Sequence, residues 1–163
     1  MSHAAPDAKG LPEPPPSVAF IVSRLGFEVS RTLADGLEPL GIDPQHFGLL
    51  RALLVMEGQS QKAVGTSLGI PPNRMVALVD DLESRGAVKR TKHPDDRRAY
   101  ALSLTPKGRK LFEGALEVAI SVESRLCGSI SKDDRSRLLE LLSRLTSFSG
   151  ALDGVHPGLT TRT

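Results

Sequence analysis

The spacing of the apolar residues changes at Gly86, and this change limits the folds that the chain can adopt. Before Gly86, apolar residues recur at three- and four-residue steps, the period of an amphipathic helix, in four stretches separated by Gly, Pro and Ser residues. After it, the period becomes two over residues 88–90 and 100–104. Helical spacing resumes after Pro106. The sequence therefore predicts a mostly α-helical chain with one two-stranded hairpin between helices.

Capping and breaking residues divide the first helical stretches. Ser17 can cap a helix that runs to about residue 40, and Pro44 suits the first turn of the next helix. Ser60 can cap a short third helix, and a turn over residues 69–73 leads into a fourth helix over about 74–85. Two helices joined by a short turn that contains glycine form a helix-turn-helix. The hairpin that follows, with its loop over residues 92–98, forms a two-stranded β-wing beside it.

Two more helices are expected after the hairpin, one opened by Thr105 and Pro106 and the last one by Ser131. Together with the first helix, they hold more apolar surface than a small winged core can cover, which favours pairing with a second copy of the chain. We expect a single domain over residues 17–150. Within it, the expected dimerisation helices span about 17–40 and 105–150 and the winged helix-turn-helix about 44–104. An arm at 1–16 with five prolines and a tail at 151–163 are predicted to be flexible.

The positive charge is concentrated in one segment. Residues 85–110 contain nine basic and two acidic residues, a local net charge of +7, so the rest of the chain contributes −5 to the total of +2. A phosphate-binding surface needs such a cluster, because attraction to nucleic acid comes from neutralising backbone phosphates. A solvated surface loop would give the same pattern.

Several classes of protein are excluded or disfavoured. No apolar run approaches the ~20 residues of a membrane-spanning helix, and the first residues lack a basic segment followed by an apolar one. A single cysteine, Cys127, cannot form an internal disulfide or a zinc site built from paired cysteines. The four histidines are scattered, and phosphate-loop and serine-hydrolase motifs are missing from the sequence. We expect a cytoplasmic protein that is not an enzyme and has no metal site and no cofactor.

Three runs of residues, Ser67–Ile70, Val79–Arg90 and Pro94–Gly108, resemble the MarR family of winged helix-turn-helix transcription regulators. The resemblance covers roughly residues 17–150, and its most specific parts are Asp-Arg-Arg at 96–98 and Leu-Thr-Pro-Lys-Gly at 104–108. It implies a homodimer formed by the terminal helices and a palindromic double-stranded DNA operator with half-sites roughly 10 base pairs apart. It also implies repression as the usual outcome and release by a small anionic or phenolic effector.

The first turns of the fourth helix would reach base edges in the major groove of DNA. Arg74 could bind guanine and Asn73 could bind adenine. Alternatively, Asn73 caps the helix and Arg74 contacts only phosphate. The DNA-binding candidates on this helix are Pro72, Asn73, Arg74 and Ala77, and those beside the DNA backbone at the start of the preceding helix are Ser60, Gln61 and Lys62.

In the wing, an ion pair of Asp95 or Asp96 with one arginine would fix the direction of that guanidinium. The resemblance implies that a wing-tip arginine enters the minor groove, with Arg97 as the first choice and Arg98 as the second. Lys92 is a further candidate for DNA contact. The alternative is an exposed salt bridge in a turn, worth under about 1 kcal/mol.

The family resemblance also suggests an effector pocket between the dimer helices and the DNA-binding lobe. The candidate residues, chosen by position, are Arg24, Arg31, His46, Phe47 and Arg51. His46 can equally be a histidine on the helix surface. Cys127, far from the first helix, is interpreted as a small apolar filler, with redox use as the alternative.

The fourth helix, which is the recognition helix of the helix-turn-helix, departs from the family pattern at two places. These are Asp81, where many members have a basic residue, and residues 76–78, which replace a more polar stretch. These differences affect the expected base preference and affinity. Because Asp80 and Asp81 weaken the basic character of this helix, a winged-helix module that binds a protein partner, with only weak non-specific DNA binding, is the alternative function.

Overall fold

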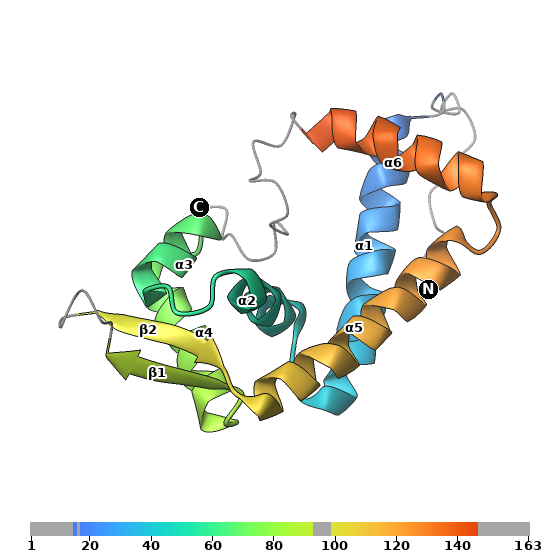
Figure 1. Ribbon diagram of the computed structural model, residues 1–163. Helices are drawn as coiled ribbons and strands as arrows, with labels where there is room; N and C mark the ends of the chain where they lie inside the picture. Colours follow the sequence, from blue (N-terminus) through green and yellow to red (C-terminus); the bar gives the residue numbers. More distant parts are fainter. Residues whose placement is uncertain (1–14, 16, 93–98, 147–163) are drawn as a thin grey trace, which may run out of the picture.

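The computed structural model describes residue 15 and residues 17–92 and 99–146. The described chain is mostly α-helical with one two-stranded antiparallel sheet, which confirms the predicted fold class. Figure 1 shows the sheet and the short helices gathered at one end, while α1 and α5 contact each other and extend away from them. In chain order, the elements are α1 (Val18–Leu37), the 3-10 helix η1 (Glu38–Leu40), α2 (Pro44–Val55), α3 (Gln61–Ser67), α4 (Pro72–Ser84), β1 (Val88–Lys92), β2 (Tyr100–Leu104), α5 (Pro106–Cys127) and α6 (Lys132–Thr146).

Both α1 and α2 begin with a side-chain cap, α1 at the predicted Ser17 and α2 at Asp43, directly before the predicted first-turn Pro44. The Oγ atom of Ser17 accepts a hydrogen bond from the backbone N–H of Phe20 at 3.3 Å. An Asp43 carboxylate oxygen accepts hydrogen bonds from the backbone N–H groups of Gln45 and His46 at 2.7 and 3.0 Å. These bonds satisfy N–H groups that a helix leaves unpaired in its first turn.

The helix-turn-helix consists of α3 and α4. Ser60 Oγ accepts a hydrogen bond from the N–H of Ala63 at 3.1 Å and caps α3. The predicted start of α4 at about residue 74 is two residues late, because Pro71 is the N-cap and Pro72 occupies the first helical position. Asn73 therefore lies inside the first turn, and the alternative in which Asn73 caps the helix is wrong.

The wing is the antiparallel pair of β1 and β2, with Lys92 opposite Tyr100 at its outer end. The sequence predicts Lys92 as the first residue of the connecting loop. In the structure it is instead the last residue of β1. The rest of the predicted loop, residues 93–98, lies outside the described residues.

The segment before α3 is hydrogen-bonded to the wing. The N–H of Gly58 donates to the carbonyl oxygen of Leu102 at 2.8 Å, and the N–H of Leu102 donates to the carbonyl oxygen of Gln59 at 3.0 Å. Ser60 and Ala101 form an isolated bridge beside these bonds. The start of α3 and the base of the wing are therefore held together by backbone hydrogen bonds.

The core lies where α2, α3, α4 and the sheet meet the C-terminal end of α1 and the N-terminal half of α5. Apolar side chains from all of these elements fill it, and burial of this kind supplies most of the stabilisation of a domain. The largest fully buried side chains are Leu37, Leu49, Leu50, Leu53, Val64, Met75, Val79, Leu82, Val88 and Leu102.

The first turn of α5 packs directly on the chain that follows α4. Thr105 caps α5, and its hydroxyl donates to the carbonyl oxygen of Gly86 at 2.6 Å. The N–H of Thr105 donates to the carbonyl oxygen of Ala87 at 3.0 Å. A Cβ atom on Gly108 would lie 2.8 Å from the carbonyl carbon of Ala87, so glycine permits this close approach.

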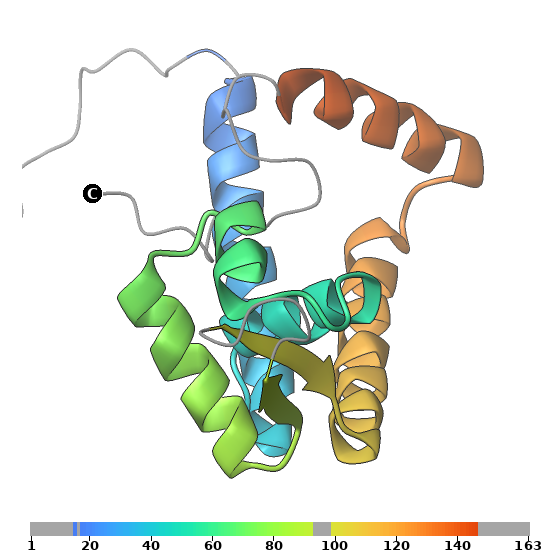
Figure 2. The same cartoon turned by 60° about the vertical axis from the view of Figure 1, so that its left-hand side comes forward.

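At the other end of the molecule, α1, α5 and α6 leave apolar side chains uncovered. Figure 2 shows α6 at the same end of the molecule as the start of α1, to one side of that helix and away from the winged lobe. Every side chain described in α6 is exposed in the single chain, including its five leucines. Where α1 crosses α5, a Cβ atom on Gly36 would come within 2.6 Å of Val118. Within the described residues, none of the helices is both long and apolar enough to cross a membrane.

Candidate nucleic-acid interface

The two sides of α4 differ in exposure. Its inner side, with Met75, Leu78, Val79 and Leu82, is buried in the core. Its outer side is exposed and contains three of the predicted DNA-binding residues, Pro72, Asn73 and Ala77, together with Val76 and Asp80. The helix is therefore fixed by its apolar stripe, and the opposite face of its first two turns is open to a ligand.

Arg74 is placed differently from the other candidates on α4. It is half-buried, and its Nε atom is buried without a hydrogen-bond partner among the described residues. A guanidinium that is only partly exposed has fewer N–H groups available for a base edge or a phosphate. The assignment of Arg74 to guanine stays a prediction.

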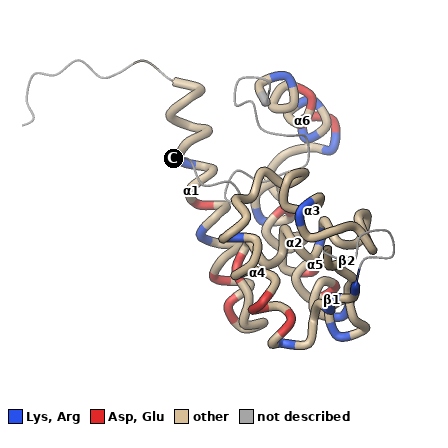
Figure 3. Tube along the Cα trace, turned by 90° about the vertical axis from the view of Figure 1, so that its left-hand side faces the viewer, with Lys and Arg blue, Asp and Glu red and all other residues tan. Residues whose placement is uncertain are grey.

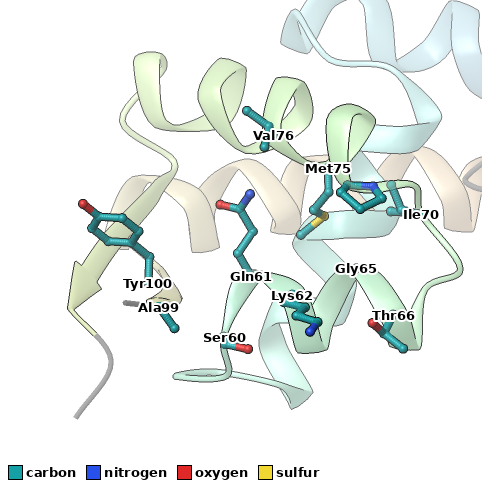
Figure 4. Close-up of a pocket in the computed structure, with 11 residues that line it drawn as sticks. Ser60, Gln61, Lys62, Gly65, Thr66, Ile70, Met75, Val76, Ala99 and Tyr100 are labelled. Atoms are coloured by element: carbon teal, nitrogen blue, oxygen red, sulfur yellow. The ribbon is translucent and has the colours of Figure 1, made fainter. Parts of the chain in front are cut away.

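A hollow of about 540 Å³ separates the recognition helix from the start of α3 and the wing. Figure 4 shows Val76 on the α4 side, Gln61 and Ser60 on the α3 side, and Tyr100 on the wing side. The predicted backbone contacts Ser60, Gln61 and Lys62 all line it. The sequence analysis treated Tyr100 only as a strand residue. Its exposure at the first position of β2, before the buried Ala101 and Leu102, is visible only in the structure.

Arg90 joins the wing to both helices of the helix-turn-helix. Its guanidinium forms ion pairs with Glu83 and with Asp80, the latter at 2.6 Å, and its Nε donates to the side-chain oxygen of Gln61 at 3.0 Å. The backbone N–H of Arg90 donates to Glu83 at 3.1 Å. Only 16% of the Arg90 side chain is exposed. Arg90 was counted among the basic residues of the phosphate-binding segment, but in the structure it neutralises two acids of α4.

The third acid of α4, Asp81, is also paired. Its carboxylate lies 2.7 Å from Nε of Arg85 and 2.9 Å from Nε2 of His46. The hydrogen bond from Arg85 holds the pKa of Asp81 below its usual range; the charge of Arg85 and the contact with His46 act in the same direction, and partial desolvation opposes them. The acidic character of α4, which favoured the protein-binding alternative, is therefore balanced by neighbouring cations.

The distribution of charge along the chain is visible in Figure 3, in which the acidic residues of α4 lie in the half of the helix that ends toward β1. Arg109 is paired as well, with Glu57 at 2.7 Å. Among the basic residues of 85–110 that the structure describes, three thus form ion pairs with acidic side chains: Arg85, Arg90 and Arg109. Lys92 is exposed at the outer end of β1. The remaining wing candidates, Asp95, Asp96, Arg97 and Arg98, lie outside the described residues.

The five residues proposed for an effector pocket are dispersed. Phe47 is half-buried and stacks on Phe112, with 5.7 Å between the ring centroids. Arg31 pairs with Glu28 at 3.1 Å on the surface of α1, and Arg24 and Arg51 are exposed.

His46 lies in the first turn of α2, where its Nδ1 accepts a hydrogen bond from the N–H of Asp43 at 3.3 Å. It lines a second hollow, of about 560 Å³, with Asp35, Glu38 and Arg85 among its neighbours. Of the five candidates, His46 is the one that lines either of the two hollows described here. The effector pocket stays a prediction.

A helix-turn-helix with an exposed recognition-helix face, flanked by a β-wing that is hydrogen-bonded to α3, defines a winged helix-turn-helix DNA-binding protein. The model of the MarR family matches residues 40–99. The transcriptional repressor CouR, solved bound to a 23-mer DNA duplex, is 31% identical, with a TM-score of 0.72 over 80% of this chain and 92% of that one. This chain belongs to the MarR family of transcription regulators, and it is a regulator rather than an enzyme.

Further comparisons agree with this assignment. CouR from Rhodococcus jostii RHA1, bound to p-coumaroyl-CoA, is 29% identical with a TM-score of 0.66, covering 78% of this chain and 90% of that one. An HTH-type transcriptional repressor of Mycobacterium tuberculosis is 25% identical over 80% of this chain and 94% of its own length. A candidate transcriptional regulatory protein for the hcr operon of Thauera aromatica is 29% identical over 64% of this chain, and the match spans 63% of that protein.

Proposed function

We propose that the protein is a homodimeric repressor that binds a palindromic operator in the cytoplasm and is released by a small-molecule effector. The observation that carries this proposal is the common face formed by the first turns of α4, the start of α3 and the outer end of the wing. A relative, CouR, has been solved on a DNA duplex.

On this face, each element has a different task. Asn73 and Ala77 project from the exposed side of α4 toward base edges, and Arg74 reaches DNA only with the exposed part of its guanidinium. Ser60, Gln61 and Lys62 contact the phosphates beside the groove. The side-chain oxygen of Gln61 accepts from Arg90, so its NH₂ group is the part that donates to a phosphate. Lys92 and the wing-tip arginines, Arg97 first and Arg98 second, contact the adjacent minor groove, and Asp95 or Asp96 holds one of these arginines in place.

The dimer would form through α1, α5 and α6. The single chain leaves large apolar side chains exposed on all three helices, and burying them against a second copy removes them from water. The domain limits of about 17–150, with dimerisation helices over 17–40 and 105–150, are part of this proposal. The exposed side chains are Val18, Phe20, Ile21, Val22, Leu25 and Phe27 on α1, Leu116, Ile120 and Leu126 on α5, and Leu138, Leu139, Leu141, Leu142 and Leu145 on α6.

An effector would act by binding more tightly to a dimer in which the two recognition helices are wrongly spaced for the operator. The exposed cations Arg24, Arg31 and Arg51 suit an anionic molecule. The relative CouR, which binds p-coumaroyl-CoA, makes a CoA thioester a sensible first probe.

The test of DNA binding is fluorescence anisotropy on a duplex from the region upstream of the gene, across a salt series, with a scrambled duplex of equal length as the control. We expect affinity for the upstream duplex at least ~10³-fold tighter than for the scrambled one, with a steep salt dependence. Arg74→Ala is expected to lose discrimination between the two duplexes. Equal and weak binding to both duplexes would contradict operator recognition in this region.

The dimer and the effector are tested separately. Sedimentation velocity is expected to give about twice the chain mass of 17.4 kDa, and a monomer at micromolar concentration would contradict the dimer. Adding p-coumaroyl-CoA to the protein–duplex complex is expected to release the duplex, whereas CoA alone serves as the control. If neither p-coumaroyl-CoA nor CoA releases the duplex, CoA thioesters are excluded as the effector class.

A further inference from the structure

The exposed face of the recognition helix is unusually apolar for a surface that meets DNA. Val76 lies in the second turn of α4, and 44% of it is exposed. It follows Asn73 by three residues and precedes Asp80 by four, so the three residues share one side of the helix. Ala77 beside it is also exposed and apolar.

Most polar side chains of this face are either paired with another residue of the protein or partly buried. Asp80 is held by Arg90 at 2.6 Å, and Arg74 is turned partly into the protein, where its Nε is buried. Asn73 is thus the polar group of the first two turns that projects fully outward. A face of this composition can offer one amide and a patch of methyl groups to the DNA.

Only one group on the floor of the major groove matches a methyl patch. Guanine, cytosine and adenine present hydrogen-bond donors and acceptors there, while thymine presents its C5-methyl group as well. We propose that Val76 packs against the C5-methyl group of a thymine and makes each half-site prefer T at that position. This proposal rests on the proposed operator binding.

A lone exposed valine is common on protein surfaces and needs no function. Val76 differs from such a residue in its position. It lines the hollow between α4, α3 and the wing, together with Ser60, Gln61 and Tyr100, and that hollow opens on the candidate DNA-binding face. A methyl contact at this point adds base preference without any hydrogen bond, which explains how a helix with few available donors can discriminate between sequences.

The experiment starts from a pool of duplexes with a randomised centre, from which the full-length protein selects its preferred sequence. Each thymine of that sequence is then replaced by deoxyuridine, which removes only the C5-methyl group and leaves base pairing intact. We expect one thymine per half-site at which this replacement weakens binding about fourfold, the effect of losing one buried methyl group.

Val76→Ala is then measured on the same pairs of duplexes. The penalty for deoxyuridine at the critical position is expected to fall below about 1.5-fold, because the partner of the methyl group has been removed. Val55→Ala is the matched control, since Val55 is an exposed valine on α2, outside the hollow, and it should keep the fourfold penalty. The scan with the unmodified protein does not depend on the folding of any variant.

The outcomes separate the two proposals. Failure to select any sequence from the pool would overturn operator binding and the thymine contact together. Selection of a sequence in which no methyl group matters, or in which Val76→Ala keeps the full penalty, would overturn the thymine contact alone.

Discussion

Replacing Gly108 by alanine is expected to separate α5 from the end of the recognition helix. Gly108 is the third residue of α5 and is buried against the backbone of Ala87. A Cβ atom there would lie 2.8 Å from the carbonyl carbon and 3.2 Å from Cα of Ala87. Carbon atoms pack at about 3.5–4.0 Å, so the two backbones must move apart. Because both sides of the contact are backbone, no side-chain rotation can relieve it.

The cost follows from what this movement disrupts. The two hydrogen bonds that Thr105 donates to Gly86 and Ala87 lie beside the contact, and each is worth about 1 kcal/mol. Overpacking adds about 1–3 kcal/mol, while the better helix propensity of alanine returns about 1 kcal/mol. We expect a net loss of about 2–4 kcal/mol in the free energy of unfolding, which corresponds to a fall in Tm of roughly 6–12 °C.

Gly114→Ala provides a matched control in the same helix. A Cβ atom on Gly114 would meet the methyl groups of Leu40 at 3.6 Å, an ordinary contact. This variant should therefore gain stability, by about 0.5–1 kcal/mol, from helix propensity alone. Urea unfolding followed by circular dichroism, at equal protein concentrations, measures both changes. A Gly108→Ala variant as stable as the unmodified protein, or two variants that shift in the same direction, would refute this reasoning.

Three further predictions concern charge. Arg90→Gln should lower the free energy of unfolding by about 1–2 kcal/mol and weaken binding to the upstream duplex at low salt, because two carboxylates of α4 lose their counter-charge. Arg109→Gln, which breaks an ion pair away from α4, is its control, and equal losses of affinity would argue against the explanation. The lowered folded-state pKa of Asp81 stabilises the protein above the ordinary carboxyl pKa of about 4, and this contribution is lost as the pH falls through the folded value. Asp81→Asn should thus cost up to about 1 kcal/mol at pH 6 and nothing in strong acid, and a difference that does not vary with pH in urea titrations would exclude this origin. Arg97→Ala should weaken binding to all duplexes alike and reduce the slope of log affinity against log salt concentration by about 1. An unchanged slope in anisotropy titrations would show that Arg97 does not contact a phosphate.

Local signals made most of the fold predictable. Ser17, Ser60 and Thr105 act through hydrogen bonds to N–H groups three residues ahead, so their role can be recognised from sequence alone. The period-two spacing also located the strands, and its error at Lys92 is small because strand ends have no capping signal as specific as those of helices. The start of α4 was placed late because two consecutive prolines allow two starting points, and only the structure selects Pro72.

Contacts between distant segments could not be predicted. Arg90 and Gln61 are 29 residues apart in sequence and meet only because the wing folds over α3. A count of charges therefore included Arg90 in the basic segment that suits phosphate binding, whereas in the fold its guanidinium pairs with Asp80 and Glu83 of α4. Likewise, the glycine of the Leu-Thr-Pro-Lys-Gly run was identified as a family feature, and its physical reason, the backbone of Ala87, lies 21 residues earlier.

The attachment of α5 to the end of α4 has a mechanical consequence. Since Thr105 binds both Gly86 and Ala87, the first turn of α5 moves with the recognition helix and the wing. A helix of 22 residues is about 33 Å long and acts as a lever arm between the two ends of the molecule. In the proposed dimer, a tilt of about 6° at its far end would displace the recognition helix by about 3.4 Å, the axial rise of one base pair. In the proposed mechanism, an effector would thereby place the two recognition helices out of register with the operator from a site that touches neither of them.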